Sequence, residues 1–166
     1  MIGQKSARWF WLAFLVVVAD RATKFAVETY TPRNFHRIVI PGLVTLVHSR
    51  NPGIAFGLLA DAGSRWVATI LIGCAALAVA LLAWLLATNR AGGRPGRVGM
   101  ALILGGATGN LIDRVTQGGV TDFFEVGLGS YRWPAFNVAD SAITIGALLV
   151  VFELLFLRRH PTKERA

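Results

Sequence analysis

The sequence predicts an all-α membrane protein with four transmembrane helices and a small β-sheet outside the bilayer. Of its 166 residues, 54% are hydrophobic and only 16% are charged, and the mean hydropathy is +0.55, which is too apolar for a water-soluble domain of this length. Four apolar stretches alternate with polar segments. The formal net charge is +8, but Lys and Arg occur in short runs between the apolar stretches and not along one polar face, so we expect no binding of nucleic acid.

The first predicted span covers about residues 9–27. A basic lead and an apolar run resemble a secretory signal peptide, but Asp20 and Lys24 occupy the positions where a cleavage site of small residues would be expected, so we predict a retained span. These two residues are four apart and share one helical face, where they can form an ion pair. Two interpretations of the pair stay open: it lets the helix end reach the interface, or it has a direct functional role.

A polar outer loop over residues 28–65 follows the first span. Its segment 37–48 contains two short runs of strand-forming residues on either side of a Pro-Gly turn, which predicts a small sheet or hairpin lying on the membrane. The Asn-Pro-Gly sequence at 51–53 then specifies a turn. A short apolar piece at 55–60 precedes the second span.

Three further spans complete the chain. Residues 66–87 carry no charge and have about the 20 residues that a helix needs to cross a hydrocarbon core. The span at 98–115 contains a G-x-x-x-G motif that begins at Gly105, which we interpret as a surface for close helix packing. Residues 116–140 form a second outer loop, and the last span covers residues 141–157.

The distribution of Lys and Arg predicts the orientation in the membrane. The N-terminal lead, the loop at 89–97 and the C-terminal tail are short and basic, which places all three on the cytoplasmic side. Residues 1–166 then form a single membrane-embedded domain of four spans with both termini inside. In this arrangement the costly polar residues converge on the outer face of the bilayer. They are Asp20, Lys24, Asn51, Asn110, Asp113, Arg114, Asp122, Asn137 and Asp140.

Asp122 and Asp140 are the candidate catalytic pair. A carboxylate beside a bilayer is costly unless it is paired, hydrated or reactive. Two close carboxylates share one proton, so the ionised one can take a proton from water while the protonated one donates a hydrogen bond to a scissile carbonyl. From spacing alone, other roles stay open. Asp140 is well placed as the N-cap of the last span, Asp122 could be a solvated loop residue, and Asp113 could form a local ion pair with Arg114.

Other reaction chemistries lack their sequence signatures. The chain contains no H-E-x-x-H, no G-x-S-x-G, no Walker loop and no dinucleotide fingerprint. Its three His residues have no ligand spacing, so we expect no metal site and no cofactor.

Five motifs resemble those of the bacterial lipoprotein signal peptidase (signal peptidase II) family. They occur in the family's order over residues 20–140, and we find no departure at the core positions. The motifs are D-R-A-T-K at 20–24, N-P-G-I-A-F at 51–56, G-G-A-T-G-N-L-I-D-R at 105–114, V-T-D-F at 120–123 and F-N-V-A-D at 136–140.

The resemblance implies an intramembrane aspartyl endopeptidase of the bacterial inner membrane, with its active site near the periplasmic face. It would remove signal peptides from diacylglyceryl-modified prolipoproteins by cutting before the lipidated Cys, and it would be inhibited by globomycin. The catalytic aspartates carry over onto Asp122 and Asp140. The residues that carry over as lining or supporting the site are Asn51, Gly53, Asn110, Arg114, Asn137, Asp20 and Lys24.

The same resemblance implies an outer β-cradle and a short periplasmic helix at the membrane interface. These fit the hairpin at 37–48 and the apolar piece at 55–60. The expected partners are lipidated prolipoprotein signal peptides and membrane lipids, and the protein is expected to be a monomer.

Three other functions remain compatible with the residues. A small proton-coupled carrier would use intramembrane Asp, Lys and Arg as a relay, although Glu153 alone lies near the other face of the bilayer. A non-enzymatic assembly factor would turn over no substrate. A Ser/Lys peptidase would pair Ser141, which adjoins Asp140, with Lys24.

Overall fold

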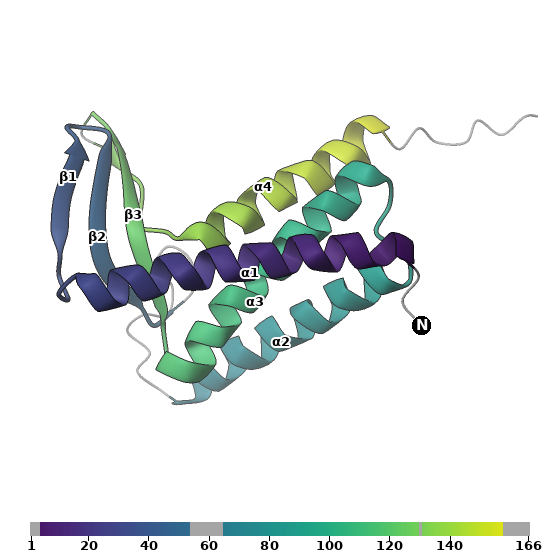
Figure 1. Ribbon diagram of the computed structural model, residues 1–166, viewed down its shortest axis with the longest axis horizontal. Helices are drawn as coiled ribbons and strands as arrows, with labels where there is room; N and C mark the ends of the chain where they lie inside the picture. Colours follow the sequence, from purple (N-terminus) through teal and green to yellow (C-terminus); the bar gives the residue numbers. More distant parts are fainter. Residues whose placement is uncertain (1–3, 54–64, 130, 158–166) are drawn as a thin grey trace, which may run out of the picture.

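The computed structural model describes residues 4–53, 65–129 and 131–157, and within these residues four long helices form a bundle with a four-stranded antiparallel sheet at one end (Figure 1). The prediction of a mostly helical protein with a small sheet is confirmed. The helices are α1 (Gln4–Tyr30), α2 (Arg65–Ala87), α3 (Arg94–Gln117) and α4 (Val138–Phe152), which continues as the π-helical turn η2 (Glu153–Leu157). The strands are β1 (His36–Ile40), β2 (Val44–Asn51), β3 (Val120–Leu128) and β4 (Tyr131–Arg132).

Each predicted span lies in a helix, but the helices extend beyond the predicted bounds because polar end residues continue the helical backbone. Helix α3 runs to Gln117, and Gly118 ends it in the left-handed conformation with φ 73°. Among the described helices, two segments are long and apolar enough to cross a membrane by length and composition, Ala68–Ala87 and Val138–Leu157. The apolar piece at 55–60, expected as an interfacial helix, lies outside the described residues.

The sheet has the order β1-β2-β3-β4. Strands β1 and β2 form the predicted hairpin, with Gly42 at φ 75° in its turn. Strand β3 lies in the segment predicted as a loop, 116–140, so that prediction is incomplete. Besides the short β4, it pairs with β2, which lies more than 60 residues earlier in the chain, and no local turn sequence predicts such a pairing. The pairing sets Asn51 opposite Val120 and Ser49 opposite Asp122.

Helix α3 contacts each of the other long helices, and glycines make the close approaches possible. A Cβ atom at Gly105 would lie 2.6 Å from Ala13 O of α1. A Cβ atom at Gly106 would press against Ala139 O of α4, well inside contact distance. The two glycines of the G-x-x-x-G motif, Gly105 and Gly109, both face α1 at close range, which confirms the interpretation of this motif as a packing surface.

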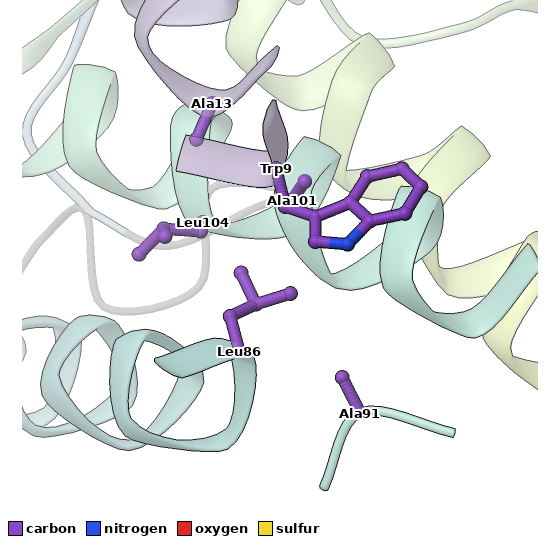
Figure 2. Packing of buried hydrophobic residues seen from close by; sticks show 6 residues of the cluster. All are labelled: Trp9, Ala13, Leu86, Ala91, Ala101 and Leu104. Carbon is purple, nitrogen blue, oxygen red and sulfur yellow. The ribbon is translucent and has the colours of Figure 1, made fainter. Parts of the chain in front are cut away.

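A small apolar core lies at the end of the bundle away from the sheet (Figure 2). Elsewhere the usual distribution is reversed: Leu77 and Leu148 are 71% and 65% exposed, whereas Asp20 and Lys24 are completely buried. Polar residues inside and apolar residues outside are typical of a protein whose solvent is lipid. The residues of the core cluster are Trp9, Ala13, Leu86, Ala91, Ala101 and Leu104.

The start of α1, the link between α2 and α3, and η2 all lie at the end of the bundle opposite the sheet (Figure 1). There the buried Glu153 carboxylate accepts hydrogen bonds from the backbone N–H groups of Gly93 at 2.6 Å and Gly96 at 2.7 Å. The side chain thus satisfies free N–H groups at the start of α3.

Candidate active site

Asp122 and Asp140 line the same cleft, which has a volume of about 820 Å³. Asp122 comes from β3, and Asp140 comes from the first turn of α4. The cleft lies between these elements, α3 and the end of β2. Its other polar lining includes Asn51, Asn110 and Arg114, so the predicted site residues are brought together.

Asn137 connects the two carboxylates. It is the N-cap of α4, and its Oδ1 accepts from the Asp140 backbone N–H at 2.9 Å while Asp140 Oδ2 accepts from the Asn137 backbone N–H at 3.3 Å. The suggested N-cap role of Asp140 is therefore wrong, since Asp140 is the third helical residue of this capping box. Asn137 Nδ2 then donates to Asp122 Oδ1 at 2.7 Å. One side chain thus touches both members of the candidate pair.

Asp122 is a buried strand residue with 3% exposure, so it is not a solvated loop residue. Burial raises its pKa to about 7, and the charge of Asp140 acts in the same direction. Hydrogen bonds with Asn137 and Asn51, and the charge of Lys24, lower this pKa in part. Below a pH of about 7, Asp122 therefore holds a proton that it can donate.

The Asp140 carboxylate is held by a hydrogen bond from Asn110 of α3. Asn110 Nδ2 donates to Asp140 Oδ1 at 2.8 Å, and Asn110 Oδ1 accepts from Lys24 Nζ at 3.0 Å. The predicted ion pair between Asp20 and Lys24 is confirmed, with 2.8 Å between Asp20 Oδ2 and Lys24 Nζ. Lys24 Nζ also lies 2.8 Å from Asp113 Oδ2. Lys24 therefore connects Asn110, which binds Asp140, to a buried ion cluster that contains Asp20 and Asp113.

The suggested local pair between Asp113 and Arg114 is wrong. Asp113 forms an ion pair with Arg21 of α1, because successive helical residues point in different directions. The signal that could have found this pair is the spacing of Asp113 three residues after Asn110, which puts both on the face toward α1. Arg114 instead donates to Asn110 O and Gly53 O, each at 3.2 Å.

Asp20 ties the first helix to the start of the last. Its Oδ1 accepts from the Ala139 backbone N–H at 2.9 Å. A Cβ atom at Gly109 would lie 2.5 Å from Asp20 Oδ2, so this glycine makes room for the carboxylate. Asp20 and Lys24 therefore lie behind the cleft and hold its walls together.

The predicted turn at 51–53 closes the cleft from the side of β2. Asn51 Oδ1 accepts from the Gly53 backbone N–H at 3.0 Å. Ser141, the nucleophile of the Ser/Lys alternative, donates its hydroxyl to Asn137 O at 3.0 Å. Lys24 is engaged by Asp20, Asp113 and Asn110, so the serine and the lysine do not form a catalytic pair.

The fold and its buried polar site define a bacterial membrane enzyme. Two solved structures described as bacterial membrane enzymes resemble this chain, each at 28% sequence identity. One has a TM-score of 0.82 and matches 96% of this chain and 94% of its own. The other has a TM-score of 0.79 and matches 90% of this chain and 94% of its own.

Sequence comparison gives the family. A lipoprotein signal peptidase of Solibacter usitatus is 44% identical over 155 residues, 92% of this chain and 94% of the relative. One of Cupriavidus necator is 46% identical over 156 residues, 92% of this chain and 86% of the relative. Residues 12–156 match the sequence pattern of signal peptidase (SPase) II. The chain belongs to this family of proteases, as its five motifs predict.

Proposed function

We propose that the protein is an intramembrane aspartyl endopeptidase that removes signal peptides from diacylglyceryl-modified prolipoproteins, cutting before the lipidated Cys. Asp122 and Asp140 are its catalytic pair, and no metal is required. The observation that carries this proposal is Asn137, which donates to the carboxylates of both aspartates that line the cleft, with its side chain to Asp122 and with its backbone N–H to Asp140. The carrier alternative has no support in the comparisons, and Glu153, its one candidate at the opposite end, is bound to backbone N–H groups.

The two aspartates divide the proton transfers between them. Ionised Asp140 takes a proton from water as the water oxygen attacks the scissile carbonyl carbon, while protonated Asp122 gives its proton to the carbonyl oxygen. When the C–N bond breaks, Asp140 passes its proton to the leaving amine, and Asp122 recovers the hydroxyl proton as the new carboxylic acid forms. The raised pKa of Asp122 supports its role as the proton donor.

The cleft suits a peptide that arrives from lipid. Ala75, Ile143 and Ile145 give it apolar walls, against which acyl chains and signal-peptide side chains can pack. The substrate helix must unwind locally, since a helix hides its carbonyl groups in hydrogen bonds. The Asn51 amide and the Arg114 guanidinium line the cleft and can donate to the exposed carbonyl groups.

The membrane arrangement belongs to the same proposal. Four spans place both termini in the cytoplasm and the sheet and cleft near the periplasmic face of the inner membrane. The start of α1 and the basic link between α2 and α3 lie at the end of the bundle opposite the sheet (Figure 1), which supports this orientation. The peptidase acts as a monomer among membrane lipids.

Substitution of each aspartate tests the proposal. Purified protein in detergent is incubated with a diacylglyceryl-modified precursor, with and without globomycin. Asp122→Asn and Asp140→Asn should each lower the cleavage rate at least about a hundredfold, because an amide can neither accept the water proton nor donate a carboxylic proton. The thermal unfolding of both variants should remain cooperative.

Ser141→Ala is the matched control, since its hydroxyl donates to the backbone oxygen of Asn137, the N-cap of its helix, and not to either carboxylate. It should retain the cleavage rate within about threefold, as expected for an exchange outside the catalytic groups. Substantial cleavage by either aspartate variant, or loss of cleavage in the serine variant, would overturn the assignment.

A further inference from the structure

The two asparagines of the site have amide groups whose direction is set by groups that can only donate. Asn137 Oδ1 accepts from the backbone N–H of Asp140, so its Nδ2 must point the other way, to Asp122. Asn110 Oδ1 accepts from the Lys24 ammonium, so its Nδ2 must point to Asp140 Oδ1. Each of these two asparagines therefore donates an amide N–H to one catalytic aspartate.

The direction of the Asn110 amide depends on Lys24. If the amide turned over, its NH₂ group would face the ammonium and its oxygen would face the Asp140 carboxylate, so both contacts would become repulsive. Asn137 Nδ2 also lies 3.4 Å from Asn110 Oδ1, but its shorter bond, at 2.7 Å, goes to Asp122. The Lys24 ammonium, 3.0 Å from Asn110 Oδ1, therefore determines the direction of the Asn110 amide more strongly than Asn137 does.

Lys24 itself is held in one place. Its side chain is completely buried, and its Nζ lies 2.8 Å from both Asp20 Oδ2 and Asp113 Oδ2. It belongs to α1, whereas Asn110 belongs to α3 and Asp140 to α4. Three helices therefore meet along one path of two hydrogen bonds.

We propose that Lys24 is a positioning residue that acts on the catalytic pair through Asn110, by fixing the amide so that its NH₂ group holds Asp140 Oδ1. This rests on the proposed function, because it concerns the same two carboxylates. It goes beyond general support of the fold: the ammonium determines which end of a neighbouring side chain faces a reacting group.

A double-mutant cycle tests the path. Lys24→Met should lower kcat for cleavage of a diacylglyceryl-modified precursor about tenfold to a hundredfold, with KM within about threefold. The reason is that the Asp140 carboxylate, which accepts the water proton, is misplaced while the cleft that binds the substrate remains. In the Asn110→Ala background the same substitution should change kcat less than about twofold, since the amide through which Lys24 acts is absent. Equal losses in both backgrounds would show a merely structural role and overturn the proposal.

Arg21→Met is the matched control. It removes a cation from the same ion cluster and the same helix, but Arg21 contacts Asp113 and not Asn110. Its kcat should stay within about threefold of the wild-type value. A loss as large as that of Lys24→Met would mean that the cluster needs charge of any kind, which contradicts the proposal.

A second variant covers the case in which Lys24→Met does not fold. Asp20→Asn with Lys24→Met removes one charge of each sign and keeps an oxygen for the Ala139 N–H, and it is compared with Asp20→Asn alone. The same loss of kcat is expected, and an unchanged kcat overturns the inference. If the wild-type protein itself fails to cleave the precursor, the proposed function is wrong; if it cleaves but Lys24 has no effect on kcat, only this inference is wrong.

Discussion

At the scale of single residues, the protonation of Asp122 predicts how activity depends on pH. Its pKa is raised to about 7, and in the proposed mechanism its proton is donated to the carbonyl oxygen. The donor is therefore present below a pH of about 7 and is lost as the pH rises through this value. The cleavage rate should fall on the alkaline side accordingly.

Asn51→Ala should move this alkaline fall to higher pH. A hydrogen bond with Asn51 lowers the pKa of Asp122, because it stabilises the ionised form. Without the bond, the pKa rises further and the proton is retained to higher pH. The measurement is kcat/KM of both proteins from pH 5 to pH 9. A fall that moves to lower pH in the variant would contradict this account of Asp122.

Local spacing predicted part of the site at this scale. The ion pair between Asp20 and Lys24 follows from residues four apart on one helix. The pairing of Asp113 with Arg21 does not, because it depends on how two helices are rotated against each other. Asn137 both caps α4 and donates to Asp122. This combination could not be predicted either, since the second contact depends on the position of β3.

At the scale of elements, glycines decide how closely α3 and α4 approach. Gly106→Ala should destabilise the protein by about 1–3 kcal/mol, because the added methyl group would press against Ala139 O. That carbonyl lies next to Asp140, so the cleavage rate should fall as well. Thermal unfolding and precursor cleavage are measured on the same preparation.

Gly73→Ala is the control for this substitution. Gly73 also lies within a helix, but a Cβ atom there meets nothing within 4 Å. This variant should be as stable as the wild type or up to about 1 kcal/mol more stable, because alanine favours the helix. Equal destabilisation at both positions would mean that contact with α4 is not the cause.

The elements differ in how well their sequence predicts them. Helix α2 is one uncharged apolar run, and its bounds follow from hydropathy almost to the residue. The β1–β2 hairpin follows from its Pro-Gly turn. Strand β3 was expected as loop because its pairing partner, β2, is distant in the chain. That strand carries Asp122, so the motif predicts the candidate pair but does not predict the strand that holds one of its members.

At the scale of the whole molecule, the proposed orientation in the membrane predicts which positions can be labelled from outside the cell membrane. Cys74 is the only cysteine and is exposed, so it is first replaced by alanine. In this background, Leu128→Cys at the sheet and Thr88→Cys after α2 give single exposed thiols at opposite ends. A membrane-impermeant maleimide added to spheroplasts should label position 128 and not position 88.

Lysis before labelling provides the control, since both thiols should then react. Labelling of position 88 in intact spheroplasts, without position 128, would reverse the orientation. Labelling of both would rule out a chain that separates these two positions by a bilayer.

The buried pair of Asp20 and Lys24 also bears on how the protein is made. Helix α1 leaves the ribosome and reaches the insertion machinery before residues 113 and 139, which later contact this pair, have been synthesised. Asp20 and Lys24 pair within one turn of α1, so the pair can form during that interval and lower the cost of carrying these two charges into the bilayer. The full cluster closes only when α3 and α4 arrive. A partly synthesised chain is therefore expected to be inactive, because Asp140 and the contacts of α3 and α4 with this pair are still missing.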